Sequence, residues 1–585
     1  MVGVNTGQEE AKQGLYAETE LIVSAKFTKQ SSDNSELLEE DKERILEKIE
    51  RGWHKFDIDH LIKKAGDTGN YQKLIFINAM LVMFTGVFAV FIVNFVVPDP
   101  EFQCKTSTGD WTSKGCYEGK ACKLLAKGLA KLKWPYPNNW TERYGYYCDH
   151  ARLREVGKAM VLICATFIGM AMLMVADFIG RKKVLITGTF LIVIGMTCAL
   201  LADNLMIKLI SMGISGAAEG IFSSLFTIFI NENTLSTTKL RSTLITGCFL
   251  AYGIGTVFIN ILTLYIRSAG HLMVFALVVI FLASFPSFFS YYESPRYLHK
   301  SGKLQKLIKV LHKISVRNEK GLEEHDFFAP TLGTITDYEA ISELTIVVKV
   351  KVKHEGPKQN ACSVFFRWKY IKTYFLLAVL GSAINLLFFG MNFSIQDLGL
   401  SSINLNGIFY GVTQSVAYVS IVPFAHKIRR KQSFIYTQIA ILLGAAALAV
   451  LSKVQKTPLV ALAETTISTC LMTVVNSIQF VFFYAYLTES FPTVVRGLAS
   501  GLVICTSRVV AASFPYVKAM SQRYGYHVLV GCSILTVISL PLTFFGTETL
   551  VHTKVKKLEK VSLETSGQVF DDDTHLNQRT ENWGG

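Results

Sequence analysis

The stretch Val175–Val184, "VADFIGRKKV", places one acidic and three basic side chains between two long apolar runs. Each flanking run is about 20 residues long, which is enough to cross roughly 30 Å of hydrocarbon as a helix. Basic residues in a short connection are typical of the cytosolic side of a membrane protein. We therefore predict that the stretch is a cytosolic turn, about eight residues long, between two membrane-spanning helices.

The composition of the whole chain also indicates a membrane protein. Of its 585 residues, 50% are hydrophobic and 18% are charged, whereas soluble proteins have about 25% charged residues. The charges are concentrated in residues 1–72, 292–369 and 548–585, and apolar runs lie between these segments. These features predict a protein that crosses the membrane several times.

Apolar runs of spanning length recur twelve times, six before the Lys-rich segment 292–369 and six after it. This arrangement is typical of two repeated six-helix halves. We therefore predict an all-α membrane protein with twelve transmembrane helices in two pseudo-symmetric six-helix bundles. The expected spans are residues 74–97, 156–176, 184–203, 206–230, 243–266, 271–291, 371–394, 405–425, 433–452, 458–486, 498–519 and 526–546.

The division of the chain follows from these spans. We expect a cytosolic N-terminal tail (1–72), an N-terminal bundle (73–291) with an extracellular loop (98–155), a cytosolic insert (292–369), a C-terminal bundle (370–547) and a cytosolic C-terminal tail (548–585).

The orientation rests on the basic residues of the short loops. The first apolar run begins near Leu74 and is too long for a signal peptide, so the N-terminus is expected to stay in the cytosol. The loops "GRKKV", "TTKLR" and "HKIRRK" then lie on the cytosolic side, as the positive-inside rule requires. We expect a plasma-membrane location. The net charge of +14 reflects this orientation, and we predict no nucleic-acid partner because no soluble domain carries a basic patch with base-stacking aromatics.

The loop 98–155 contains four of the eleven cysteines, Cys104, Cys116, Cys122 and Cys148. Four cysteines in an extracellular loop predict two disulfides, with three pairings open. A zinc site is the alternative, but the regular Cys-x-x-Cys spacing is missing. Asn139-Trp140-Thr141 is a glycosylation sequon in the same loop, and we predict a glycan at Asn139.

Asp177 is the informative residue of the opening stretch, because an acid adds nothing to a positive-inside turn. An Asp at a helix end can hold a neighbouring helix by its N-terminus. The order Asp-x-x-Gly-Arg-Lys between two spans resembles the signature of the major facilitator superfamily. In that family it is understood to latch the cytosolic ends together while the cavity faces outward. The matching residues here are Asp177, Gly180, Arg181 and Lys182.

The signature is incomplete in both halves. Leu173 and Phe178 stand where the family usually has Gly and a basic residue. At the matching place of the second half, "HKIRRK" has His426 for the Asp and Arg429 for the Gly. We therefore expect any second latch to work differently.

Charged turns recur at equivalent points of the two halves. Glu232 and Arg241 flank the turn after the fourth span, and Glu489 and Arg496 flank the turn after the tenth. We include these four residues in the predicted latch. After the sixth span, "ESPRYLHKSGK" contains a Glu and an Arg (Glu293 and Arg296) that we expect to pair at the surface.

Longer stretches narrow the resemblance. "FDIDHLIKKAGDTGNYQKLIFI", the cysteine-bearing loop, "ESPRYL" and "ESFPTVVRG" together resemble the organic cation, anion and carnitine transporters, over roughly residues 56–546. The resemblance implies the major facilitator fold and alternating access for small organic ions. Sugar porters are the nearest alternative, but they have a Gln-Gln-Leu-Ser type sequence where this chain reads "GSAINLLFFGMN".

Two ionisable residues, Glu219 and Arg508, lie deep inside predicted spans of opposite halves. Such a group costs about 2.5–3.5 kcal/mol to insert and usually faces a cavity or a partner. We expect both to meet near the middle of the membrane, where transporters of this type bind substrate.

The resemblance gives Arg508 a role, because cation transporters carry Asp at the corresponding place and anion and carnitine transporters carry Arg. A guanidinium would bind a carboxylate or a sulfate. Glu219 would pair with Arg508 in the empty site, bind a cationic group of a zwitterion such as carnitine, or accept a coupling proton. A purely structural ion pair is the alternative.

Other positions leave the charge of the substrate open. Tyr418 stands where anion transporters often have Lys, and Gln414 where cation transporters often have Glu. The further substrate-binding candidates are Tyr252, Asn385, Tyr418 and Gln479. Their alternative roles are packing, lipid contact and hydrogen bonding between spans.

The sequence has no Gly-x-x-x-x-Gly-Lys-Ser/Thr phosphate loop and no credible catalytic or metal-ligand cluster. We therefore predict no ATP use, no enzyme activity, no metal and no cofactor other than a coupling H⁺ or Na⁺. The mode of transport (uniport, exchange or ion coupling) stays open, and no protein partner is identified. A non-transporting receptor or scaffold and a sugar facilitator are the alternative functions.

Two polar segments carry weaker patterns. The residues before the first span, "SELLEEDKERILEKIERGWHKFDIDHLIKKAG", have apolar residues at helical spacing and predict an amphipathic helix or a solvated tail. In the insert, "TIVVKVKVKHEGPK" alternates apolar and basic residues, which is consistent with a short strand or a regulatory contact.

Overall fold

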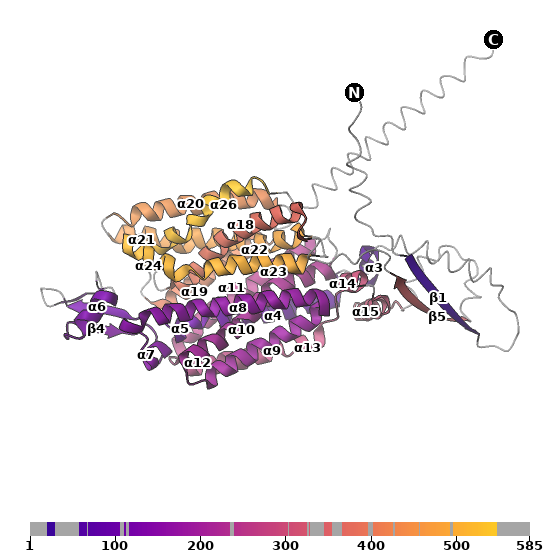
Figure 1. The fold of residues 1–585 in the computed structure, drawn as a ribbon, viewed down its shortest axis with the longest axis horizontal. Coiled ribbons are helices and arrows are strands. Elements are labelled where there is room, and N and C mark those ends of the chain that lie inside the picture. The colour runs from indigo at the N-terminus through magenta and orange to yellow at the C-terminus, as the bar shows by residue number, and fades with distance from the viewer. Residues whose placement is uncertain are drawn as a thin grey trace, which may run out of the picture.

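The chain folds as two helical bundles with small polar substructures at both ends (Figure 1). This computed structural model describes residues 20–29, 58–66, 68–105, 110–112, 116, 118–234, 239–301, 303–323, 327, 344–353, 365–395, 402–424, 428–454, 457–491 and 495–546.

The first bundle contains the six spans predicted for the N-terminal half. Its helices are α4 (Asn70–Phe91) with α5 (Val93–Val96), α8 (Ala151–Ile179), α9 (Arg181–Leu201), α10 (Leu205–Asn233), α11 (Lys239–Tyr265), and α12 (Ala269–Ser284) with α13 (Ser287–Ser290).

The second bundle repeats this order. Its helices are α18 (Trp368–Phe393), α19 (Ile403–Ile421), α20 (Arg430–Leu451), α21 (Pro458–Thr465) continued by the π-helical segment η5 (Thr466–Met472) and α22 (Thr473–Ser490), α23 (Arg496–Ala511) with α24 (Phe514–Tyr524), and α25 (Val528–Cys532) with α26 (Ile534–Thr543). The break between α23 and α24 precedes Pro515, which lies in the first turn of α24, where a proline is well tolerated.

Each of the twelve predicted spans coincides with one helix or with consecutive helices, so the predicted fold is confirmed. Among the described residues, nine helical segments are long and apolar enough to cross a membrane, and Ala269–Ser284 and Val528–Thr543 are shorter apolar segments. Helix α19 occupies the place of the eighth span. The two bundles meet where α8 packs on α23 and α11 packs on α19.

The prediction of a turn about eight residues long within Val175–Val184 is wrong. Helix α8 runs to Ile179 and α9 begins at Arg181, so Gly180 alone connects them. Gly180 has a φ of +106°, which suits glycine, and a side chain there would overlap the carboxylate of Glu293. That carboxylate accepts hydrogen bonds from the backbone N–H groups of Arg181 (2.8 Å) and Lys182 (3.3 Å). Glu293 thus satisfies the first N–H groups of α9, which allows the helix to include the basic residues.

The cysteine-bearing loop forms a subdomain at one end of the bundles, which we call the loop end (Figure 1). Strands β2 (Glu101–Lys105), β3 (Trp111–Thr112) and β4 (Ala130–Lys133) make an antiparallel sheet in the order β3-β2-β4, beside α6 (Glu118–Leu125), α7 (Trp140–Tyr144) and η1 (Cys148–His150). Of the three pairings left open, the structure contains Cys104–Cys116 and Cys122–Cys148.

The subdomain is attached to the first bundle. The Tyr136 hydroxyl donates to the Ile266 carbonyl, and the Thr141 hydroxyl donates to the Pro98 carbonyl. Lys208 of α10 lies over the Trp140 ring, 4.8 Å from its centroid, a distance typical of a cation–π contact.

The polar segments gather at the opposite end, which we call the insert end (Figure 1). It contains α3 (Ile58–Ala65), α14 (Pro295–Lys300) and α15 (Leu304–Arg317). The Asn318 side chain fastens α15 to the start of α4, since it accepts from the Tyr71 N–H (2.8 Å) and donates to the Gly66 carbonyl (2.8 Å).

The two weaker sequence patterns have different outcomes. The alternating stretch of the insert is strand β5 (Leu344–Lys353), which pairs antiparallel with β1 (Glu20–Lys29). An amphipathic helix was also expected before the first span. Helix α3 is its last part, and the residues before α3 lie outside the described part of the chain.

We expect Gly255→Ala to destabilise the first bundle. A Cβ at Gly255 of α11 would lie 2.5 Å from the backbone oxygen of Phe84 in α4, and overpacking of this kind costs about 1–3 kcal/mol. Gly270→Ala in α12 is the matched control, because no heavy atom lies within 4 Å of its added Cβ. Thermal unfolding of the purified proteins in detergent checks this, and equal melting temperatures for the two variants would contradict it.

Candidate functional site

A buried ion pair joins the two bundles at their centre. The Arg508 guanidinium of α23 donates from Nη2 to Oε2 of Glu219 on α10, at 2.7 Å. Their side chains are 1% and 4% exposed. Buried charges require a partner, since removing one leaves the other uncompensated. The close approach depends on Gly220, because a Cβ there would lie 2.8 Å from Nη1 of Arg508.

Aromatic residues from three helices surround this pair. The Arg508 guanidinium lies 5.5 Å from the ring centroid of Phe389 on α18, within cation–π distance. Tyr252 of α11 and Tyr484 of α22 are near enough to interact electrostatically with both charges. The site thus combines one guanidinium and one carboxylate with an aromatic wall, which suits a small organic ion.

Several buried polar atoms of this pair and of the helices around it have no hydrogen-bond partner among the described residues. They include Nε of Arg508, the hydroxyl of Tyr252 and Oδ1 of Asn385. Asn385 lies on α18, which packs against α23, and its Nδ2 donates to the Gly381 carbonyl at 2.9 Å. A buried unsatisfied group costs about 1–3 kcal/mol, so these atoms mark places where a ligand would be stabilised.

The remaining predicted substrate residues are Tyr418 and Gln479. Tyr418 of α19 is next to Gln414 and Ser477, and its ring centroid is 6.1 Å from that of Phe249. Gln479 donates from Nε2 to the Thr437 hydroxyl of α20 at 2.9 Å, so it serves the contact between α22 and α20.

Sequence reasoning missed Phe389 and Gly220. The signal for Gly220 was its position next to Glu219, where a small residue admits the guanidinium. Phe389 lies within a Phe-rich stretch of α18, and nothing in the sequence distinguishes it from its neighbours.

At the insert end, Arg181 is the centre of the predicted latch. Its guanidinium contacts Asp177 (Nη2 to Oδ1, 2.9 Å) and Glu232 (Nε to Oε2, 3.1 Å), and it lies 4.5 Å from the ring centroid of Tyr297. These contacts join α8, α9, α10 and α14.

Asp177 also reaches the second bundle. Its carboxylate lies against Gly497 in the first turn of α23, because a Cβ at Gly497 would overlap it. An acid at a helix N-terminus is stabilised by the helix dipole. A second contact between the bundles runs from the Asn231 amide to the Thr488 hydroxyl at 2.8 Å.

The second bundle repeats the Arg–Glu half of this arrangement. Arg430 begins α20 as Arg181 begins α9, and it pairs with Glu489 near the end of α22 at 3.6 Å. The position that matches Asp177, His426, lies outside the described residues.

The acids of the two charged turns contact arginines on other helices. Glu232 contacts Arg181, and the side chain of Arg241 in α11 lies outside the described set. Arg496 donates from Nε to the Phe491 carbonyl at 3.3 Å. The predicted surface pair of Glu293 with Arg296 is wrong, because Glu293 holds the start of α9 and Arg296 contacts Asp59 at 2.7 Å.

At the loop end, Asp99 joins the two bundles. Its carboxylate contacts Lys158 and Arg154 (3.2 Å) of α8 and Lys518 (3.0 Å) of α24. Burial acts to raise the pKa of Asp99, but the three cations together hold that pKa well below its usual range.

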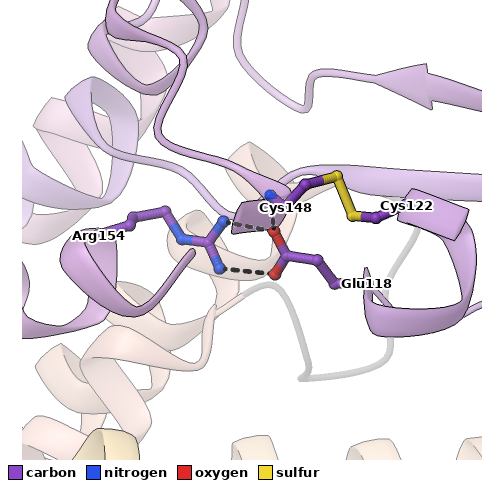
Figure 2. The surroundings of a disulfide bond; sticks show 4 residues. All are labelled: Glu118, Cys122, Cys148 and Arg154. Carbon is purple, nitrogen blue, oxygen red and sulfur yellow. Dashed lines mark hydrogen bonds and ion pairs between the residues drawn. A yellow bond between two sulfur atoms is a disulfide. The ribbon is translucent and has the colours of Figure 1, made fainter. Parts of the chain in front are cut away.

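The disulfide-bonded subdomain supports this junction (Figure 2). Arg154 forms two hydrogen bonds with the Glu118 carboxylate, at 3.2 and 3.1 Å, and the same carboxylate accepts the backbone N–H of Cys148 at 3.1 Å. Since Cys148 is bonded to Cys122, a disulfide fixes the acid that orients Arg154.

The structure does not support a glycan at Asn139. Asn139 is fully buried, its Nδ2 donates to the Tyr136 carbonyl at 2.7 Å, and its Oδ1 accepts the Glu142 N–H as the N-cap of α7. The nitrogen that would carry a sugar is therefore occupied. The sequon pattern does not distinguish a surface Asn from one used as a helix cap.

Comparisons with known proteins agree with the fold. A family model described as Major Facilitator Superfamily matches residues 155–515. The chain is 24% identical to "Solute carrier family 22 member 6" of Rattus norvegicus, over 75% of this chain and 72% of that protein. It is also 24% identical to "Organic anion transporter 3" of Mus musculus, over 71% and 73%.

Among solved structures, the chain resembles the proton:xylose symporter XylE bound to 6-bromo-6-deoxy-D-glucose. The TM-score is 0.57 at 15% identity, over 82% of this chain and 96% of that one, which shows a shared fold. The matched relatives are transporters. The prediction that the chain is not an enzyme is therefore confirmed.

We expect Asp177→Asn to loosen the start of α23. Loss of an acid at a helix N-terminus removes up to about 1 kcal/mol, so amide hydrogen exchange in residues 497–500 should rise about fivefold. The control is Asp203→Asn, the same change at an exposed acid between α9 and α10. Unchanged exchange in Asp177→Asn, or an equal rise in both variants, would contradict the contact.

We expect the junction at Asp99 to be insensitive to mild acid. A carboxyl whose pKa is depressed by folding stabilises the structure above its usual pKa, and this contribution is lost only as the pH falls through the depressed value. Hydrogen exchange in residues 516–519 of α24, which Asp99 contacts through Lys518, corrected for intrinsic rates, should be equal at pH 5.5 and 7.5. In Asp99→Asn it should be faster at both pH values. A junction that opens at pH 5.5 would disprove this.

Proposed function

The chain belongs to the major facilitator superfamily, and we propose that it transports small organic ions across the membrane, with organic anions and zwitterions favoured over cations. The observation that carries the proposal is the Arg508–Glu219 pair, which is buried between the two bundles at 2.7 Å. The similarity to an organic anion transporter adds support.

In this proposal the substrate competes with Glu219 for Arg508. A guanidinium binds a carboxylate or sulfate through parallel hydrogen bonds, and its Nε has no partner among the described residues. The aromatic residues Phe389 and Tyr252 would contact the apolar part of the substrate. Asn385, with an unsatisfied Oδ1, would hydrogen-bond to it.

The charge balance of the buried site then requires a positive charge or a proton beside Glu219 whenever an anion is bound to Arg508. Once an anion occupies Arg508, the Glu219 carboxylate is left without its partner in a buried site, which is costly. The groups that face Glu219 are Arg508, Tyr252 and Tyr484, and the two tyrosines supply no further positive charge. A zwitterion would solve this by placing its cationic group beside Glu219. A simple anion would require that Glu219 take up a proton.

Alternating access would then break one end at a time. At the insert end the contacts to break are Asp177 with Gly497 and Asn231 with Thr488. At the loop end the contacts include Asp99 with Lys518 and the Asn94 amide with the Asn392 carbonyl at 2.9 Å. We place the insert end and both termini in the cytosol and the loop end outside the cell, in the plasma membrane, on the positive-inside bias of the short loops.

Uptake of three labelled compounds tests the proposal: 1-naphthyl sulfate (an anion), carnitine (a zwitterion) and tetraethylammonium (a cation). We expect uptake of the sulfate or of carnitine, reduced at least tenfold by Arg508→Ala at equal surface level, because a buried charge pair contributes about 2–5 kcal/mol. Saturable uptake of tetraethylammonium that survives the substitution would refute the anion preference. Hexose uptake insensitive to Arg508→Ala would favour a sugar facilitator instead.

Arg508→Ala alone leaves Glu219 buried without a partner, so a charge-balanced control is needed. We compare Glu219→Gln with the double variant Arg508→Ala/Glu219→Gln. If Arg508 binds substrate, only the double variant loses anion uptake. If the pair is purely structural, the two variants carry the anion equally. The sulfate ester stays ionised between pH 5.5 and 7.5, so faster uptake at pH 5.5 that disappears in Glu219→Gln would identify Glu219 as the proton acceptor.

A further inference from the structure

Helix α15 at the insert end carries a row of basic side chains on its exposed face. The helix contains no acidic residue, and the first acid after it, Glu319, accepts a hydrogen bond from the Asn70 amide at 3.2 Å. Residues three or four positions apart lie on one face of a helix. The proposed transport of organic ions gives this face no role. The row, which we call the basic row of α15, consists of Lys306, Lys309, Lys313 and Arg317, and all four are exposed.

The opposite face of α15 fixes the helix to the rest of the insert end. The helix packs against α3, α14 and α4 (Figure 1). Asn318, the residue after α15, accepts a hydrogen bond from the Tyr71 N–H in the first turn of α4, at 2.8 Å. The basic row therefore has a fixed position beside the start of the first span. The buried residues of the opposite face are Leu307, Ile308, Leu311 and Ile314.

The basic row borders the lipid-facing surface of the first bundle. The Nζ atom of Lys313 lies 6.0 Å from the ring centroid of Tyr292, and that ring stacks on Tyr71 with centroids 5.1 Å apart. Tyr292 lies just after α13, which contacts α4. On these two helices Phe289 is 71% exposed and Ile77 is 56% exposed, so their apolar side chains face lipid. The row thus lies where the hydrocarbon ends, with a tyrosine between the two, which is typical of a membrane interface.

We propose that the basic row of α15 binds anionic phospholipids of the cytosolic leaflet. Lysine and arginine side chains donate hydrogen bonds to the phosphate and carboxylate oxygens of lipid headgroups. The negative surface potential of this leaflet attracts basic segments close to the membrane. The lipid-facing surface beside the row favours a lipid headgroup over a soluble anion. The inference goes beyond the proposed transport, because it requires only that the insert end lies at the cytosolic leaflet.

Lipid binding to α15 would also support the contacts at the insert end. Helix α14 packs against α15, and Tyr297 of α14 contacts the junction between α8 and α9. Its hydroxyl donates to the Phe178 carbonyl at 2.9 Å, and its ring centroid lies 4.5 Å from the Arg181 guanidinium. A headgroup that holds α15 at the membrane surface would therefore hold α14 against the residue at the centre of the predicted latch.

Amide hydrogen exchange of the full chain in nanodiscs tests the inference. Discs of phosphatidylcholine alone are compared with discs that contain about 30% phosphatidylserine. Exchange in residues 304–317 should be at least about fivefold slower with phosphatidylserine, the factor that one basic residue contributes near an anionic surface. The triple variant Lys309→Gln/Lys313→Gln/Arg317→Gln should lose this difference. Equal exchange of the wild type in both discs, or the full difference in the triple variant, would overturn the inference.

Two control variants separate the basic row from other effects. A variant with Lys105, Lys123 and Lys127 changed to Gln loses three exposed charges of the loop-end subdomain and should keep the full difference. If it does not, the net charge of the chain and not the row attracts the lipid. The variant Lys309→Arg/Lys313→Arg/Arg317→Lys keeps all charges and should also keep the difference. Its loss there would show that packing of α15, and not charge, is responsible, and would likewise overturn the inference.

A soluble anion is the alternative ligand of the row, and the same measurement distinguishes it. Inorganic phosphate or inositol hexakisphosphate is added to wild-type protein in discs of phosphatidylcholine alone. Neither should slow exchange in residues 304–317. Slowing equal to that with phosphatidylserine would mean that the row binds a soluble phosphate compound, which would overturn the assignment to lipid. The measurement involves no uptake, so a failure of the proposed transport leaves its outcome unchanged.

Discussion

The contact on which the rest of the structure depends is the ion pair of Glu219 and Arg508. Each residue belongs to a different bundle, and neither charge can be left alone in the membrane interior. The pair therefore draws α10 and α23 together at the centre, where Gly220 leaves room for the guanidinium. The pair can also separate, because a ligand that binds one of the two charges more strongly would release the other charge.

The two ends of the bundles are joined by the same kind of contact, in which an acid of the first bundle meets the second bundle. At the insert end an acid of the first bundle, Asp177, meets the start of a helix in the second. At the loop end another acid of the first bundle, Asp99, meets Lys518 of the second. Both acids are also held by basic residues of their own bundle, Arg181 and Lys158 respectively. Each carboxylate can thus leave the second bundle without losing all its partners, so opening an end costs less than breaking an isolated buried pair.

The sequence predicted the features that depend on composition and period: the twelve spans, the four loop cysteines, and the depth of Glu219 and Arg508 in opposite halves. It also predicted that Glu219 and Arg508 meet, but it did not predict the partners of the charged residues in the turns. Glu293 contacts the start of α9 and Glu232 contacts Arg181 of another helix, because packing decides these contacts over long sequence separations.

The one-residue connection at Gly180 was missed because basic residues between two apolar runs resemble a loop. Only the structure shows that Glu293 accepts the first N–H groups of α9. For Gln479 the sequence left both roles open, because an amide in a span suits a ligand or a neighbouring helix equally well, and the structure shows its contact with Thr437.

The disulfide-bonded subdomain is fastened to the first bundle through Tyr136, Thr141 and Trp140. In the proposed alternating access, it would therefore move together with that bundle as one rigid body. If the bundles move as proposed, a fluorophore on this subdomain and a second one on the Tyr524–Tyr526 turn of the other bundle would move apart and together in each transport cycle. Single-molecule distance measurements from the subdomain could thus follow the movement of the bundles without a change in any of their helices.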